Sequence, residues 1–201
     1  MRRLVLWSGI DAWRAEVAGV ELGRDSMAAA GTQLGADPVT YRLDYELRTG
    51  PAFVTDVLDV AVTGEGWTRR LRLARDDDGS WTWDTEEHGE APLPPPGGDA
   101  EEVKGALDCD LALSPLTNLM PIRRHLLHER PGHADFLMAW VSVPDLGLHP
   151  SEQRYEHVRR DAGGSVVRFV GRDPDFVAEL VLDRDGFVEL YPELARRVRT
   201  D

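Results

Sequence analysis

The chain has 201 residues, a hydrophobic fraction of 42% and a formal net charge of -13 at pH 7. This acidic balance argues against nucleic-acid binding and against anionic membrane surfaces, because both need lysine and arginine to neutralise phosphate. The single cysteine, Cys109, excludes an internal disulfide and a thiolate zinc cluster, and it fits a reducing compartment. The length suits one large domain or two small ones, and we expect a single domain over residues 1–201.

The apolar runs are short throughout the chain. The first of them, residues 4–7, is followed closely by Asp11, and it is too short for a signal-peptide core. No later run approaches the length of a membrane span. We therefore expect a cytoplasmic protein without stable membrane insertion.

Alternation of apolar and polar residues dominates the first half of the chain. Residues 39–48 place Val, Tyr, Leu, Tyr and Leu on one face and Thr, Arg, Asp, Glu and Arg on the other, which is typical of a half-buried strand. Similar patterns predict strands at residues 53–62 and 67–75. Asp78 and Gly79 then predict a hairpin turn into a strand at 81–83.

A proline- and glycine-rich stretch, residues 86–102, predicts a surface loop. Beyond it the alternation resumes, and we expect strands at residues 134–143, 153–160, 165–171, 176–182 and 187–191. Residues 192–198 are predicted to form a short helix with Pro192 in its first turn. The whole pattern predicts a mainly β protein: one large antiparallel curved sheet that forms a half-barrel, with short helical turns.

The segment 108–124 combines carboxylates, prolines and arginines with apolar residues. Asp108 and Asp110 occupy the polar face of a predicted strand. Ser114 and Pro115 then predict a single helical turn that ends before Pro121, since proline disfavours helical angles in the preceding residue.

Buried carboxylates need partners, and arginine supplies a bidentate one. One interpretation is therefore a structural knot that pins a crossover loop. It would involve Asp108, Asp110, Ser114, Pro115, Thr117 and Pro121. A polar patch for a ligand head group and a catalytic or metal-binding carboxylate remain alternatives.

At these residues the chain resembles the family called "putative glycolipid-binding", formerly a domain of unknown function. The resemblance is carried by Asp110, Leu111, Ser114, Pro115, Thr117, Asn118, Pro121, Ile122, Arg123, Arg124, Trp140, Pro144, Asp145, Leu146, the run 150–155, Tyr191 and Pro192. It implies a fold similar to bacterial lipoprotein carriers, in which a half-closed antiparallel sheet surrounds an apolar concavity.

The resemblance leads us to expect non-enzymatic binding of a hydrophobic or amphipathic ligand such as a glycolipid, with no cofactor, no metal and no catalytic residue. The candidate ligand-binding residues are Asn118, Arg123, Arg124, Trp140 and Tyr155. Aromatic side chains on the strands either fill the core or line an apolar pocket.

Two other functions stay open. One is a hydrolase or isomerase that uses Asp108, Asp110 and a histidine. The other is a structural or assembly protein that pairs through an open sheet edge. The histidines of residues 125–133 match no strong zinc spacing, and residues 76–79 predict a turn rather than a calcium loop.

Overall fold

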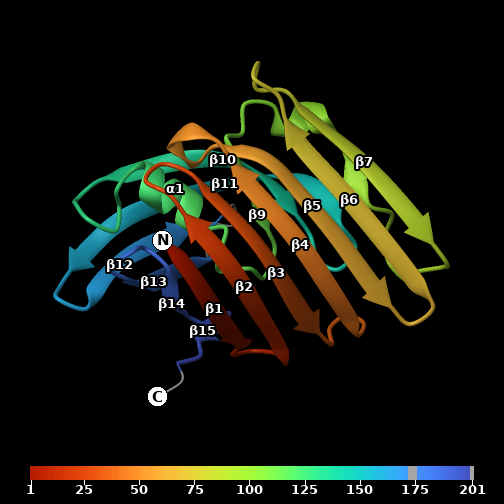
Figure 1. Cartoon of the computed structure of the whole chain (residues 1–201), viewed down its shortest axis with the longest axis horizontal. Helices are drawn as coiled ribbons and strands as arrows, with labels where there is room; N and C mark the ends of the chain where they lie inside the picture. Colours follow the sequence, from red (N-terminus) through yellow and green to blue (C-terminus); the bar gives the residue numbers. More distant parts are fainter. Residues whose placement is uncertain (172–175, 200–201) are drawn as a thin grey trace.

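The structure, a computed structural model, describes residues 1–171 and 176–199 (Figure 1). Within these residues, fifteen strands form one mixed sheet. Their bounds are β1 Arg2–Gly9, β2 Arg14–Leu22, β3 Met27–Gly35, β4 Tyr41–Thr49, β5 Thr55–Gly64, β6 Trp67–Arg75, β7 Trp81–His88, β8 Gly97–Gly98, β9 Asp108–Leu111, β10 His133–Val141, β11 Gly147–Arg160, β12 Gly164–Val170, β13 Val177–Asp183, β14 Val188–Tyr191 and β15 Ala195–Arg197. The described helical elements are η1 Pro51–Phe53, η2 Ala100–Val103 and α1 Leu119–Arg124.

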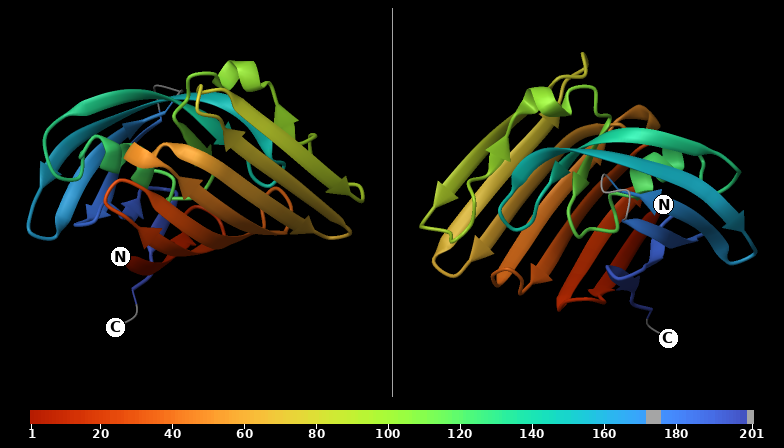
Figure 2. Two further views of the ribbon diagram at one scale, coloured as in Figure 1. Left: turned by 45° about the horizontal axis from the view of Figure 1, so that its top comes forward. Right: turned by 180° about the vertical axis from the view of Figure 1, so that it is seen from behind.

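The strand order is β7-β6-β5-β4-β3-β2-β1-β15-β14-β13-β12-β11-β10-β9, and β8 pairs with β11. The first and last strands, β1 and β15, therefore lie side by side in the middle of the strand order. The sheet continues on one side of them to β7 and on the other side to β9. The sheet bends into two limbs, β1–β7 and β10–β13 (Figure 2). The prediction of a mainly β fold with one large curved sheet is confirmed. Two of the pairs, β9 with β10 and β8 with β11, are parallel.

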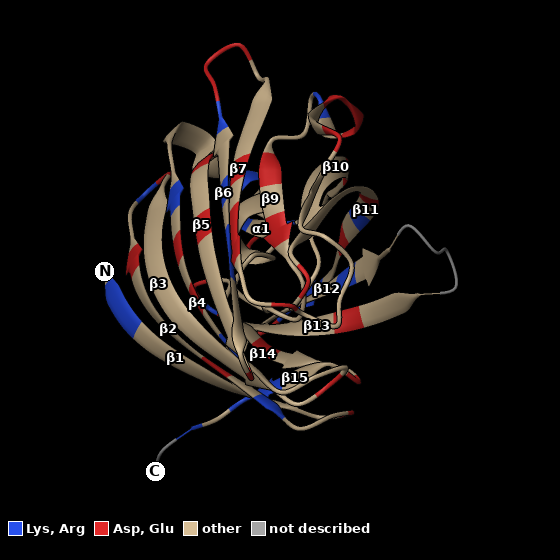
Figure 3. Ribbon diagram, turned by 90° about the vertical axis from the view of Figure 1, so that its right-hand side faces the viewer, with Lys and Arg blue, Asp and Glu red and all other residues tan. Residues whose placement is uncertain are grey.

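The inside of the curve is filled by the 108–124 segment. Viewed from the side, α1 and β9 lie within the bend of the sheet (Figure 3). The N–H of Thr55, at the start of β5, donates to the carbonyl of Leu107 at 3.0 Å. The N–H of Cys109 donates to Thr55 Oγ1 at 3.0 Å. These bonds hold one edge of the sheet against the opposite limb.

Two cores result, one on each side of β9 and β10. Cys109, Ala139 and Val141 pack into the larger core with the inner face of β1–β7. Met138, one position away, packs into the smaller core with Tyr155 and the inner residues of β12 and β13. Because both faces of β10 are covered, its sequence reads as a nearly continuous apolar run.

The aromatic side chains of the first limb belong to the larger core. Trp67, Trp81, Tyr41 and Tyr45 are all buried there, and Trp83 packs against it while partly exposed. The interpretation that these rings fill the core is confirmed for these residues.

The strands β1, β2 and β3 have no clear counterpart in the predicted strands. Small residues weaken the alternation of apolar and polar residues in these strands. One of these small residues, Gly31, is required by the packing. A Cβ atom added at Gly31 would lie 2.5 Å from the ring of Tyr45 on the neighbouring strand. Glycine is needed there for the close approach of the ring, although it lowers strand propensity.

Two helix predictions were wrong. Residues 192–198 form a turn followed by β15, because the backbone of this segment pairs with β1; the N–H of Ile10 donates to the carbonyl of Leu194 at 3.1 Å. The helix in the 108–124 segment begins at Leu119, after the turn predicted to be helical. Pro121 lies in its first turn, where a missing N–H removes no intrahelical bond.

The proline-rich stretch 86–102 is mostly irregular. Strand β7 extends into it as far as His88, and β8 and η2 occupy its last third. Arg69 on β6 anchors it by donating to the carbonyls of Leu93 at 3.3 Å and Pro94. The single-domain organisation over residues 1–201 stays a prediction.

Candidate functional site

Asp108 and Arg124 form a buried ion pair. Both terminal nitrogens of Arg124 donate to the carboxylate, with Nη1 2.8 Å from Oδ2. Arg124 also donates through Nε to the carbonyl of Ala52 at 2.7 Å and through Nη2 to that of Phe53 at 3.1 Å. Burial raises the pKa of Asp108, and the guanidinium opposes this shift. The pair therefore ties α1 to β9 and to η1.

Asp110 is the centre of a second polar cluster. Its carboxylate accepts from Thr117 Oγ1 and from Gln153 Nε2, each at 2.7 Å. The hydroxyl of Tyr155 lies 2.9 Å from Asn118 Oδ1, to which it donates. Burial raises the pKa of Asp110, and the hydrogen bonds from Thr117 and Gln153 oppose the rise. The cluster joins β9, the turn before α1 and β11.

The remaining predicted residues lie at the margins of these clusters. Arg123 donates to the carbonyl of Asp185 at 2.7 Å, and its guanidinium lies 5.3 Å from the centre of the Phe53 ring. Trp140 is partly buried, 5.7 Å from the ring of His149.

Most of the candidate ligand residues make their polar contacts within the protein. The bonds of Arg124, Asn118 and Tyr155 fit the structural interpretation of the segment. Pro115 supports it as well, since its carbonyl accepts from Asn118 Nδ2 at 3.3 Å. A role for these side chains with a ligand head group stays a prediction.

The contacts of His125 and His128 do not include Asp108 or Asp110, so they do not support the hydrolase alternative. His125 packs edge-on against Phe136 at 5.2 Å, and His128 is buried with Nε2 3.4 Å from Glu129. Burial lowers the pKa of both imidazoles. Within residues 1–171 and 176–199, no group of three or more His, Cys, Asp or Glu is placed to hold a metal ion. The thiol of Cys109 is buried, which raises its pKa to about 12.

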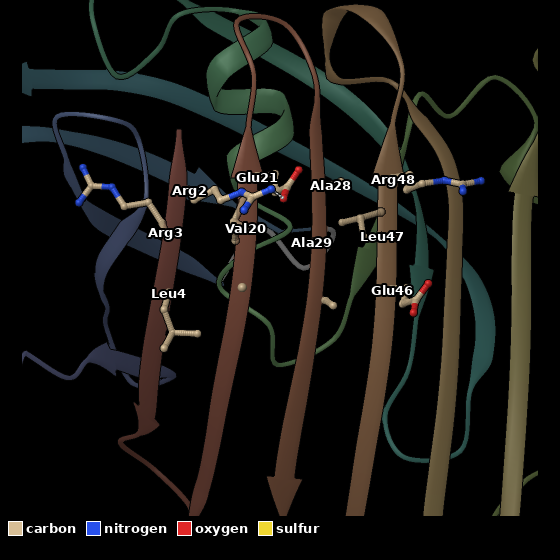
Figure 4. Close-up of a pocket in the computed structure, with 12 residues that line it drawn as sticks. Arg2, Arg3, Leu4, Val20, Glu21, Ala28, Ala29, Glu46, Leu47 and Arg48 are labelled. Carbon is tan, nitrogen blue, oxygen red and sulfur yellow. Dashed lines mark ion pairs between the residues drawn. The ribbon is translucent and has the colours of Figure 1, made fainter.

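Two adjoining hollows lie on the outer face of β1–β6, and we call them together the outer furrow; Figure 4 draws residues that line the first of them. Their volumes are about 600 Å³ and 550 Å³, and they share Leu4, Gly19, Ala30 and Glu46. The first hollow is lined by Arg2, Arg3, Leu4, Gly19, Val20, Glu21, Ala28, Ala29, Ala30, Glu46, Leu47 and Arg48. The second adds Val17, Gly31, Thr32, Asp44, Tyr45, Asp59, Ala61 and Arg70.

The furrow follows from the register of four neighbouring strands. Leu4, Gly19, Ala30 and Glu46 are successive cross-strand partners on β1–β4. Side chains of cross-strand partners share a face of the sheet. The two central positions carry almost no side chain, so the surface sinks between a leucine on one side and a glutamate on the other.

On β1 the outer furrow is apolar at Leu4 and charged at Arg2 and Arg3, and on β4 and β5 it is charged at Glu46 and Asp59. Leu4 is 76% exposed, and Leu6 and Val17 beside it are 39% and 37% exposed. On the other side Asp59 accepts from Arg70 at 2.7 Å and 2.9 Å, and this guanidinium lowers the pKa of the carboxylate. A single surface feature thus offers apolar area next to paired hydrogen-bonding groups.

The residues that line the outer furrow are not among the candidate ligand-binding residues named from the sequence. The sequence feature that indicates the furrow is the run 4–7, four consecutive apolar residues in a strand. Such a run is apolar on both faces, and in β1 one of those faces points to solvent.

Glu16 is a second group missing from the sequence-based candidates. It points into the larger core from β2, where its Oε1 accepts from Tyr45 Oη at 2.6 Å and from Ser114 Oγ at 2.7 Å. Burial raises its pKa to about 7. Ser114 therefore connects the 108–124 segment to the first limb of the sheet.

Comparisons with known proteins place the chain in a family. No curated protein matches it. The crystal structure of a DUF1089 family protein from Pseudomonas aeruginosa is similar over 95% of this chain and 94% of its own, with 26% identity and a TM-score of 0.68. None of the helices in the described residues has the length and apolar character needed to cross a membrane. The family model described as "Putative glycolipid-binding" matches residues 4–197, and the chain belongs to that family.

Proposed function

We propose that this protein binds an amphipathic ligand, a lipid that carries a sugar head, in the outer furrow and without chemical conversion. The family's description supports a binding role. The observation that carries the proposal is that exposed apolar surface around Leu4 lies across the outer furrow from the charged groups of Glu46 and Asp59. An amphipathic molecule likewise has an apolar part and a polar part.

The apolar tail would lie along Leu4, Leu6 and Val17, over the small residues of the floor. Burial of roughly 200 Å² of apolar surface at about 25 cal/mol per Å² favours binding by about 5 kcal/mol before the cost of association. A shallow open surface therefore supports weak to moderate affinity.

The head group would meet the charged side of the outer furrow. Carboxylates accept hydrogen bonds and guanidinium groups donate them, and a sugar hydroxyl can take either role. The lining of the furrow holds four arginines and four carboxylates, Asp59 is already paired with Arg70, and the protein has a net charge of -13. These charges favour a neutral sugar over a phosphate head group.

The interior of the half-barrel is a less suitable location, because the side chains of the two cores fill it. A site next to Arg123 and Trp140, which are both partly exposed, is the competing location on this chain.

Calorimetric titration with octyl glucoside, below the concentration at which it forms micelles, tests the proposal. A Cβ at Gly19 would meet only the carbonyl oxygen of Ala30, at 3.8 Å, so Gly19→Leu can fill the furrow while the strand is preserved. Loss of roughly 60 Å² of apolar contact predicts affinity about tenfold weaker.

The matched control is Thr68→Leu, which adds the same side chain at an exposed position of β6 outside the furrow. It should bind as the wild type does. Equal affinity of Gly19→Leu and wild type, or loss of binding only in Arg123→Gln, would reject the outer furrow as the site.

A further inference from the structure

A small cavity lies where the inner face of the β1–β4 limb meets the turn that leads into α1. It is lined by Trp7, Arg14, Glu16, Gln33, Tyr41 and Leu113, among others. The space that a water-sized sphere can occupy is about 10 Å³. This is close to the lower limit for one water molecule, and it is too small for a larger guest.

Three unpartnered polar atoms belong to side chains that line this cavity. In the described part of the chain, seven buried side-chain nitrogen or oxygen atoms have no hydrogen-bond partner. Among the seven are Arg14 Nε, Glu16 Oε2 and Gln33 Oε1. Glu16 and Gln33 are 4% and 3% exposed. Buried polar groups are almost always satisfied, so this concentration indicates a missing partner.

Each of these side chains also has a polar atom that is already bonded. Arg14 Nη2 donates to the carbonyl of Leu194 at 2.9 Å, and Gln33 Nε2 donates to that of Ala112 at 3.5 Å. Glu16 Oε1 accepts from Tyr45 and Ser114. When Glu16 is ionised, the three atoms without a partner are one donor, Arg14 Nε–H, and two acceptors.

Water is the small guest whose hydrogen-bonding capacity matches that set. It can accept one bond and donate two at once. An ammonium ion has no acceptor for the N–H of Arg14, and a hydroxyl group donates only one bond. We propose that this cavity holds one ordered water molecule, which donates to Glu16 Oε2 and Gln33 Oε1 and accepts from Arg14 Nε.

The position of this water gives it a structural role. It joins β2 to β3 inside the first limb, and through Glu16 it reaches Ser114 at the start of the turn before α1. Buried waters of this kind serve otherwise unsatisfied polar groups and are costly to remove.

A high-resolution crystal structure of the wild-type protein tests the proposal directly. The expected result is a density peak within hydrogen-bonding distance of Glu16 Oε2, Gln33 Oε1 and Arg14 Nε. A dry cavity in which Glu16 Oε2 contacts Gln33 Oε1 would overturn it, because a carboxyl proton would then bridge the two oxygens.

Oxygen-17 magnetic relaxation dispersion gives an independent reading in solution, since it counts long-lived internal waters. Gln33→Met removes an acceptor with little change in side-chain length, and it should have one long-lived water fewer than the wild type. The control is Ser142→Ala, which removes a buried hydroxyl that is bonded to Asp145 and lies outside this cavity. It should keep the count. An unchanged count in folded Gln33→Met would also reject the site.

Discussion

Replacement of Glu16 by glutamine should change how the stability of the protein depends on pH. The carboxyl group is 4% exposed, and burial raises its pKa from 4.5 to about 7 despite donors from Tyr45 and Ser114. Between these two values the folded protein holds a proton that the unfolded chain has released. Because the folded-state pKa is the higher one, stability is full below pH 4.5 and is lost as the pH rises towards 7.

The size of this loss follows from the two pKa values. The difference between 4.5 and about 7 corresponds to about 3 kcal/mol, at ~1.4 kcal/mol per pH unit. Glu16→Gln keeps the shape of the side chain but cannot ionise. The difference in unfolding free energy, variant minus wild type, should therefore rise by about 3 kcal/mol from acid to neutral pH. Contributions of Asp108 and Asp110 are common to both proteins and cancel.

Urea unfolding of both proteins at a series of pH values from about 4 to about 8 measures this difference. The control is Glu21→Gln on the same strand, whose carboxylate is exposed and pairs with Arg2 at 2.7 Å. Solvent screens that pair, so its difference should vary little with pH. A difference for Glu16→Gln that stays constant over this range would refute the reasoning.

Three further predictions concern stability and reactivity. Arg124→Met should destabilise the fold by about 3–5 kcal/mol in urea unfolding, because Asp108 is left buried without its cation; a loss under about 1 kcal/mol would contradict the structural role of the pair. Gly31→Ala should cost about 1–3 kcal/mol, since its Cβ meets a tyrosine ring at 2.5 Å, whereas Gly19→Ala should be neutral or stabilising; equal melting temperatures would be the contrary result. Cys109 should react with a thiol-specific reagent only after unfolding, because it is buried and its pKa is about 12; rapid labelling of the native protein would contradict this.

How well each strand could be predicted from the sequence depended on what covers its two faces. Residues 39–48 identify β4 because charged side chains point outward and apolar ones inward. In β1–β3 the outward residues include Leu4, Gly19 and Ala30, so polar and apolar faces are hard to distinguish. The strand β15 is defined by its pairing with β1 and β14, which local sequence does not specify.

The sequence was also only a partial guide to the buried polar groups. The sequence indicates that Asp108 and an arginine could pair, and the structure identifies Arg124 as the partner. Glu16 went unnoticed because acidic residues are frequent in this chain. Its signal is positional: it shares an alternating face with Ala18, Val20 and Leu22, all buried. An acidic residue on an otherwise apolar strand face is the pattern that could have identified it.

The most direct test of the proposed function is an amide NMR titration of the labelled protein with octyl glucoside monomers. Binding in the outer furrow predicts that the largest chemical-shift changes occur at Gly19, Ala28 and Ala30, with smaller changes along β1 and β4. Changes confined to residues around Arg123 and Trp140 would move the site to the competing location. No change at any accessible concentration of the monomer would contradict binding of an amphipathic ligand in the outer furrow.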